Sequence, residues 1–289
     1  MSSLPTVRLG TSDTLVTRLI SGGNPLCCNS HFSDAMNREM SAYFTAERVV
    51  AYLHHLQQSG INTLQARGDY HRVLHWLELF HREGGQLQWI AQTASEMSDV
   101  FRNIRILAAA GAVGIYHHGT RTDRFWQEGR IDEARDYLTC MRDCGVQVGL
   151  GTHIPQVIEY AEEKEWDVDF YMACLYNLNR QPRESALVSG ATASSSEVFL
   201  PEDPPRMCET IRQTEKTCLA FKILGASRLC ATQQTVRSAF EFAFASIKPS
   251  DAVVVGMFPK HVDQIALNVQ HALAALAPQV SSWYMVDGY

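Results

Sequence analysis

The segment IDEARDYLTCMRDCGVQVGLG, residues 131–151, contains one complete unit of a helix followed by a strand. Its apolar residues recur at helical spacing as far as Asp143, and Gly145 follows as a C-terminal glycine does. The short apolar run Val146–Leu150 is typical of a buried strand. Because the same unit recurs along the chain, we predict helices that alternate with parallel strands.

Eight such units are expected in one domain that spans residues 1–289. The predicted strands are Leu19–Ile20, Ile61–Leu64, Leu87–Ala91, Ala112–Tyr116, Val146–Leu150, Phe170–Cys174, Cys218–Ile223 and Ala252–Val255. The predicted helices are Ala46–Gln58, Tyr70–Glu83, Met97–Ala110, Ile131–Asp143, Ile154–Glu163, Pro205–Glu215, Ala231–Ser246 and Lys260–Ala275. Eight βα units close an α/β fold of the (β/α)8 TIM barrel type. An open doubly wound sheet would need a GxGxxG turn after the first strand, and Ser21-Gly-Gly-Asn24 does not supply it.

Composition narrows the classes of function. The chain has 289 residues, of which 46% are hydrophobic, and a formal net charge of −6. It has no cluster of Lys and Arg interleaved with aromatic residues, so nucleic acid is not an expected partner. No apolar run approaches the ~18 residues of a membrane helix, and no leader segment is visible. We expect a cytoplasmic protein with a small-molecule substrate; its oligomeric state is left open.

Cysteine and histidine spacing does not favour a metal site. The eight Cys residues are scattered without CxxC spacing, which argues against a disulfide framework and a zinc ribbon. A vicinal disulfide or a thiol nucleophile at Cys27-Cys28 is the alternative to ordinary packing. Potential metal ligands follow the predicted strands, but no HxH or HExxH spacing supports a metal centre. They are His31, Asp69, Glu96, His117, His118 and His153.

Several motifs spread over the whole chain resemble one family. They are Val7–Gly23 followed by Pro25-Leu26, Gly60-Ile-Asn62, Asp123–Gly151, Leu175-Tyr-Asn177, Leu219–Gly225 and Val255–Asn268. Together they resemble the aldo/keto reductase superfamily. The resemblance implies an N-terminal hairpin, a TIM barrel, NADP or NAD as cofactor, and a small carbonyl or alcohol as substrate.

The resemblance also implies which residues carry the chemistry. The family donates a proton from a Tyr whose acidity is tuned by a Lys and an Asp, and a His orients the carbonyl. Aligned without gaps, Tyr70 falls on the catalytic Tyr, whereas Gln65 replaces the Asp. The Lys position falls among the uncharged residues Gln92, Thr93 and Ala94. Without a neighbouring cation, a Tyr with a pKa near ~10 is a poor proton donor at neutral pH.

Two further candidates could complete such a site. One of His117 and His118 is expected to face the barrel axis, because adjacent strand residues point to opposite sides. Lys222 ends the predicted seventh strand and is a candidate replacement cation. Arg67, just past the second strand, would suit an anionic substrate, because Arg does not shuttle protons.

The segment after the last strand resembles the segment that binds the cofactor in the family. The resemblance places cofactor contacts at Phe221, Gly256, Lys260, Gln264 and Asn268, and the last three share one helix face. The alternative function is a non-redox barrel. It would be a metal- or Lys-dependent enzyme, or a ligand-binding module, that has lost reductase chemistry.

Two irregular segments remain. The stretch 180–204 follows strand six and is expected to be either a lid over the barrel mouth or a flexible insert. The aromatic residues of 276–289 predict a tail that packs on the barrel or on a neighbouring protein.

Overall fold

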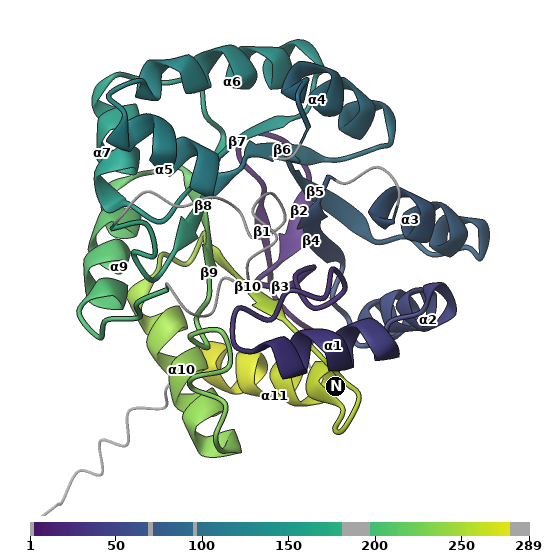
Figure 1. Cartoon of the computed structure of the whole chain (residues 1–289). Helices are drawn as coiled ribbons and strands as arrows, with labels where there is room; N and C mark the ends of the chain where they lie inside the picture. The colour runs from purple at the N-terminus through teal and green to yellow at the C-terminus, as the bar shows by residue number, and fades with distance from the viewer. Residues whose placement is uncertain (1–2, 69–71, 95–96, 181–196, 278–289) are drawn as a thin grey trace, which may run out of the picture.

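The computed structural model of this chain describes residues 3–68, 72–94, 97–180 and 197–277. Eight parallel strands close a barrel, and helices surround it (Figure 1). The order around the barrel is β10-β3-β4-β5-β6-β7-β8-β9. The strands are β3 (Leu19–Gly22), β4 (Thr63–Arg67), β5 (Gln88–Gln92), β6 (Gly114–His117), β7 (Gln147–Thr152), β8 (Phe170–Cys174), β9 (Thr217–Phe221) and β10 (Ala252–Gly256). The predicted (β/α)8 TIM barrel is confirmed.

Strand positions agree with the sequence prediction, and the boundaries differ by a few residues. Most strands begin or end later than predicted, because pairing with both neighbours, rather than the apolar run alone, sets where a strand stops. β9 is the exception that matters for function. It ends at Phe221, and Lys222 already has a left-handed backbone with φ +60°. Lys222 therefore starts the following loop instead of ending the strand.

The outer layer consists of helices that the sequence largely predicts. They are α1 (Asp34–Tyr43), α2 (Ala46–Gln58), α3 (Val73–Arg82), α4 (Val100–Ala109), α5 (Gly119–Gln127), α6 (Ala134–Asp143), α7 (Pro155–Glu163), α9 (Asp203–Gln213), α10 (Gln233–Ser246) and α11 (Gln264–Leu276), with a 3-10 turn, η1 (Ile131–Glu133), before α6. Thr45 caps α2 by accepting a hydrogen bond from Arg48 N at 3.4 Å. Gly60, Gly111 and Gly145 end their helices with φ of +83°, +86° and +74°, as expected for left-handed C-terminal glycines.

The sequence analysis missed two of these helices, α1 and α5. α1 buries only Met40, so it has no apolar stripe to detect. α5 starts at a glycine and contains two arginines and an aspartate within nine residues. Its stability comes from packing against β7 rather than from intrinsic helix propensity.

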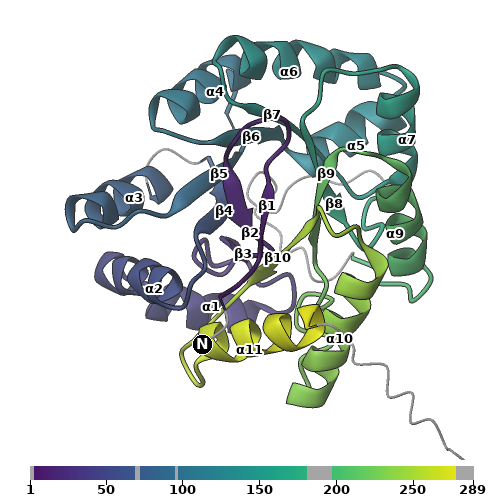
Figure 2. The same ribbon diagram turned by 180° about the vertical axis from the view of Figure 1, so that it is seen from behind.

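An N-terminal hairpin closes the barrel at the amino end of its strands. β1 (Thr6–Arg8) and β2 (Leu15–Thr17) pair antiparallel, and Figure 2 shows them lying across the barrel when it is viewed from behind. Val7, Leu9 and Val16 join the interior cluster that includes Tyr116 and Phe170. The hairpin therefore fills the amino end of the barrel, so a ligand can enter only from the carboxyl end.

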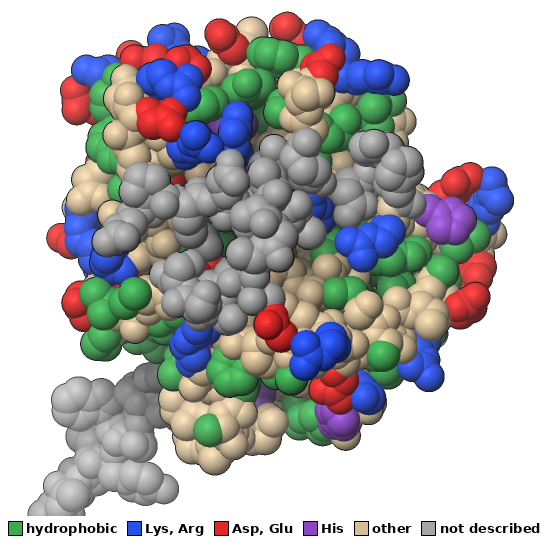
Figure 3. Space-filling view, in the orientation of Figure 1, with side chains coloured by type: hydrophobic (Ala, Val, Ile, Leu, Met, Phe, Trp, Pro, Cys, Tyr) green, Lys and Arg blue, Asp and Glu red, His purple; other side chains and the backbone are tan. Residues whose placement is uncertain are grey.

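The outer surface of the described residues is charged and mixed. On the face shown in Figure 3, acidic and basic side chains are interspersed over the helices. None of the described helices is both long enough and apolar enough to cross a membrane. The described cysteines form no disulfide; Cys27 is buried and Cys28 half-buried.

Gly149 should be sensitive to substitution because the barrel interior has no spare space. A Cβ there would lie 2.4 Å from Phe170 Cζ and 2.5 Å from Tyr116 Cβ. We expect Gly149→Ala to lower the free energy of unfolding by about 3 kcal/mol in urea titrations. Gly129→Ala is the control, since it strains a φ of +68° but meets no atom within 4 Å, and it should cost about 1 kcal/mol. Equal losses in both variants would contradict tight packing at Gly149.

Candidate functional site

A cavity of about 630 Å³ opens at the carboxyl end of the barrel, between the loops that follow β3, β9 and β10. At the barrel axis it is lined by Gly22, Asn24, Gln65 and Phe221. Away from the axis its walls come from α1, α10 and α11, including Met36, Met40, Gln233, Val236, Gln264, Leu267 and Asn268. Its volume lies within the range of about 300–1,000 Å³ that is typical of small-molecule and cofactor sites.

Most of the cofactor contacts implied by the resemblance line this one cavity. Phe221, Gly256, Gln264 and Asn268 belong to its walls. Gln264 also accepts a hydrogen bond from Phe258 N at 2.8 Å, which holds the start of α11 against the loop after β10. Lys260 is outside the lining, and its Nζ lies 2.7 Å from Glu39 Oε1.

The loop after β9 has an unusual backbone. Lys222, Gly225, Ala226 and Ser227 all have left-handed φ angles, of +60°, +57°, +49° and +72°. A non-glycine residue in this region costs roughly 1–2 kcal/mol, and such strain is concentrated at ligand sites. Successive N–H groups in turns of this kind can point at a common anion. The N–H of Gly225 donates to Lys222 O at 2.8 Å, and Ala226 and Ser227 line the cavity.

Basic and aromatic side chains lie around the same loop. Lys222 lines the cavity, and its Nζ lies 6.0 Å from the centre of the Phe199 ring. The Arg228 guanidinium stacks on Phe199 at 3.7 Å. Phe199 in turn lies 4.9 Å from the Tyr176 ring. These contacts give the cavity one positively charged side.

Only part of the predicted lid can be compared with the structure. Residues 181–196 lie outside the described part of the chain, as do 278–289 of the predicted tail. Just after the first gap, the Glu197 side chain is buried and its Oε1 lies 2.9 Å from His31 Nδ1. The described end of this segment therefore packs against the loop after β3, at the edge of the cavity. α9 starts at Asp203, two residues before the predicted Pro205.

The centre of the barrel mouth holds a neutral network in place of the family's charged pair. Gln65 Nε2 donates to Tyr116 Oη at 2.8 Å. Burial raises the pKa of the Tyr116 phenol far above its usual range, although hydrogen bonds from Gln65 and Gln92 and the charge of Arg67 act in the opposite direction. Tyr116 is therefore a neutral phenol that does not ionise near neutral pH. The hydrogen-bond partners of Tyr116 are Gln65, at the family's Asp position, and Gln92, near the family's Lys position.

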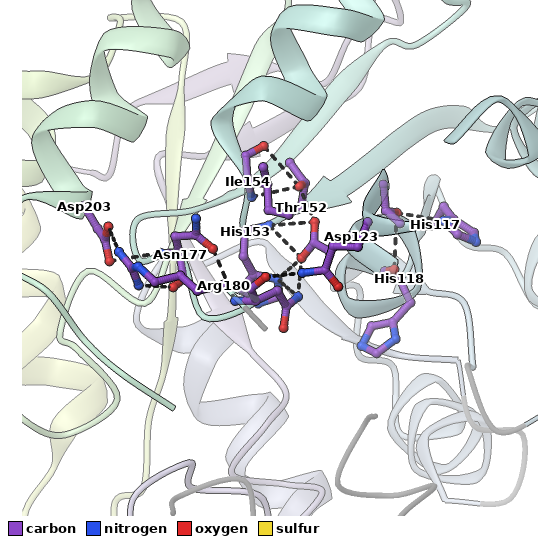
Figure 4. A network of polar contacts seen from close by, with 12 residues as sticks. His117, His118, Asp123, Thr152, His153, Ile154, Asn177, Arg180 and Asp203 are labelled. Carbon is purple, nitrogen blue, oxygen red and sulfur yellow. Dashed lines mark hydrogen bonds and ion pairs between the residues drawn. The ribbon is translucent and has the colours of Figure 1, made fainter. Parts of the chain in front are cut away.

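The two adjacent histidines point in different directions (Figure 4). The His117 ring lies outside the barrel wall, where it stacks on Tyr137 at 5.0 Å and on Phe125 at 5.7 Å. Its Nδ1 lies 2.8 Å from Thr122 Oγ1. Burial, with help from the Arg121 charge, lowers the pKa of His117 to about 3. His117 does not face the mouth, and we assign it no catalytic role.

His118 follows β6 and is the N-cap residue of α5, and its side chain points away from that of His117 (Figure 4). Its backbone N–H donates to Thr93 Oγ1 at 3.0 Å, and Thr93 is one of the uncharged residues near the family's Lys position. Tyr70 belongs to residues 69–71 and Glu96 to 95–96, so both lie outside the described part of the chain.

The sequence analysis missed a second buried group, which is drawn in Figure 4. Asp123 on α5 and His153 after β7 lie within hydrogen-bond distance, with Asp123 Oδ2 2.7 Å from His153 Nδ1. Asn179, after β8, donates to the same carboxylate. From the sequence, His153 is a possible metal ligand and the end of Gly151-Thr-His153, which stands at the resembled family's accessory Gly-x-Ser-Asn motif. Asp123 lies in a helix that was not predicted. Among the described residues, no group of three or more His, Cys, Asp or Glu side chains could hold a metal ion.

Comparisons with known proteins bear on the fold alone. No protein-family model and no curated protein sequence matches this chain. A Pseudomonas aeruginosa structure described as an aldo-keto reductase is 20% identical, covers 94% of this chain and 96% of its own, and has a TM-score of 0.56. The glycerol dehydrogenase of Gluconobacter oxydans is 11% identical over 94% of this chain and 96% of its own, with a TM-score of 0.51.

A barrel of different chemistry is comparably similar. The truncated 3-deoxy-D-arabino-heptulosonate 7-phosphate synthase of Thermotoga maritima is 13% identical over 94% of this chain and 91% of its own, with a TM-score of 0.53. At these identities the similarity establishes a shared barrel, and function has to be argued from the site.

The burial of His117 predicts a specific acid sensitivity. Its folded pKa of about 3 lies below the ordinary value of 6.5, so the unfolded chain binds a proton that the folded chain does not. Stability is therefore full above about pH 6.5 and falls as the pH drops toward 3, with a slope of up to about 1.4 kcal/mol per pH unit. We expect the difference in unfolding free energy between wild type and His117→Gln to shrink from pH 7 to pH 4 in denaturant titrations. His75→Gln, at an exposed position, is the control and should show no such trend. A parallel pH dependence in wild type and His117→Gln would mean that His117 is not buried.

Proposed function

We propose that this protein is an aldo/keto reductase-like oxidoreductase that binds a nicotinamide dinucleotide in the 630 Å³ cavity and acts on a small carbonyl or alcohol. The observation that supports it most is the convergence of Phe221, Gly256, Gln264 and Asn268 on this cavity. These residues were chosen from the resemblance alone, and they come from β9, β10 and α11.

The chemistry of the lining suits each part of such a cofactor. The left-handed turn at Gly225–Ser227 and the Lys222 ammonium suit a diphosphate. The Asn268 amide can both donate to and accept from an adenine ring, and the Phe221 ring offers an aromatic face near the barrel axis. When bound, the cofactor would supply hydride exchange with the substrate, while the protein supplies position and charge.

The neutral network at the mouth limits the expected activity. Because Gln65 and Tyr116 hydrogen-bond each other, no Lys–Asp pair of the family type tunes a phenol there. The resemblance assigns proton donation to Tyr70, with His118 beside the carbonyl. We expect common aldehydes to be reduced slowly, and a narrower substrate range than in enzymes with the complete set of residues.

The same neutral network favours a second candidate function. A barrel without redox chemistry could use the cavity for a phosphate-bearing ligand, because the loop after β9 and Lys222 serve any phosphate equally well. The two candidate functions differ in whether the nicotinamide group contributes to ligand binding. Competition between inorganic phosphate, ADP-ribose and the full dinucleotide separates them.

Lys222 gives a test of the cofactor site. NADH and NADPH fluorescence should change on titration with the protein, and Lys222→Met should weaken binding of the preferred form about tenfold, or ~1.4 kcal/mol, through loss of a charged phosphate contact.

Two lysines serve as matched controls for that test. Lys164→Met removes an exposed ammonium that pairs with Glu163, and it should leave affinity unchanged. Lys260→Met should have a smaller effect than Lys222→Met, because the Lys260 ammonium is engaged by Glu39 outside the cavity. If neither nucleotide binds at high micromolar concentration while phosphate esters do, the non-redox candidate replaces the proposed function.

A further inference from the structure

A buried histidine–carboxylate pair lies at the carboxyl end of β7. His153 Nδ1 lies 2.7 Å from Asp123 Oδ2. His153 is 5% exposed and Asp123 is 0% exposed. Asp123 comes from α5 and His153 from the end of β7, so the pair depends on how this helix docks on the barrel.

The described groups around the Asp123 carboxylate donate to it. Besides the His153 ring, the donors are the Thr152 hydroxyl, the Asn179 amide and the His153 backbone N–H, the last at 3.2 Å from both carboxylate oxygens. A carboxylate that accepts several hydrogen bonds is held in one orientation. Asp123 therefore holds the His153 ring in place as well as making contact with it.

This arrangement selects one tautomer of the imidazole. Because Asp123 accepts at Nδ1, that nitrogen carries the proton, and Nε2 on the opposite edge of the ring carries the lone pair. The nearest other charged groups of the network in Figure 4 are Arg180 and Asp203, which pair with each other. Among the described residues, Asp123 provides the carboxylate that contacts the His153 ring.

The His153 ring lies next to the proposed ligand cavity. Its centre is 5.7 Å from that of the Phe221 ring, in an edge-to-face contact, and Phe221 lines the cavity. On another side, α5 begins at Gly119, where a Cβ would lie only 3.3 Å from His153 Cε1. The start of α5 is thus shaped around this imidazole.

We propose that His153 exchanges a proton with the ligand bound at the barrel axis, and that Asp123 is the positioning residue that fixes its tautomer. This inference rests on the proposed function for the place of the ligand. It assigns the proton transfer to a neutral imidazole on β7, in contrast to the Tyr70 that the resemblance would favour.

The proton transfer is balanced in both directions. In alcohol oxidation, Nε2 would take the hydroxyl proton as the O–H bond breaks, and the hydrogen on the adjacent carbon would leave with the C–H electron pair, so that a carbonyl remains. A bound nicotinamide would be the acceptor of that hydride. The imidazolium then releases its Nε2 proton to water. In reduction, the imidazolium gives that proton to the developing alkoxide, and Nδ1–H stays on Asp123 throughout.

The first test compares three variants of the full chain. His153→Gln should lower kcat for carbonyl reduction by about 10²–10⁴-fold, with nucleotide Kd changed by no more than about threefold. Asp123→Asn should lower kcat by at least about 100-fold, because an amide no longer enforces the Nδ1-protonated tautomer. His117→Gln is the matched control, since it removes another buried histidine at a strand end, and it should keep kcat within about threefold. Loss of turnover in Tyr70→Phe but not in His153→Gln would overturn the proposal.

A second measurement does not depend on turnover. Imidazole ¹⁵N spectra should show His153 protonated at Nδ1 in wild type and a mixture of tautomers in Asp123→Asn. Diethyl pyrocarbonate should modify His153 faster than His117, and NADH or ADP-ribose should slow that reaction. An unreactive His153, or one protonated at Nε2, overturns the inference. Absence of nucleotide binding with a reactive His153 overturns the proposed cofactor and leaves the proton-transfer role standing.

Discussion

The Tyr116 side chain fills the barrel interior next to the mouth. The residues around it must leave room for the phenol. A Cβ at Gly149 would lie 2.5 Å from Tyr116 Cβ, and one at Gly151 would lie 3.0 Å from Tyr116 Cδ2. β7 therefore needs glycine at both positions for the phenol to fit. Once Tyr116 is in place, Gln65 donates a hydrogen bond to it, so the described contact at this point of the axis is between two neutral side chains.

Because Tyr116 and Gln65 fill the axis, the other notable groups of the mouth lie to either side of it, near neighbouring strands. On one side, the loop after β9 keeps three non-glycine residues in left-handed conformations beside the cavity. On the other side, α5 holds Asp123 against His153. Phe221 connects the two, because it lines the cavity and contacts the His153 ring. A ligand that reaches Phe221 from the cavity comes close to the imidazole.

The site differs from the sequence expectation in kind as well as in detail. The cavity lining includes four of the five cofactor residues that the resemblance implies. The catalytic residues it implies do not come together among the described residues. His117 stacks outside the barrel, Gln65 is engaged by Tyr116, and Tyr70 lies outside the described residues. The structure adds Asp123 and His153, which lie 30 residues apart in sequence.

The sequence by itself determined the barrel. The spacing of apolar residues, with glycines after helices such as Gly111 and Gly145, predicted all eight strands, because a buried parallel strand and an amphipathic helix each leave a local signal. The tertiary structure alone decided where β9 ends, that α5 forms, that His117 stacks outside the barrel, and that Asp123 meets His153. Each of these depends on contacts between distant segments, such as Gly119 against His153. A helix with little apolar surface and a residue with left-handed backbone are stabilised by residues that are distant in the sequence. Short-range sequence patterns therefore do not predict them.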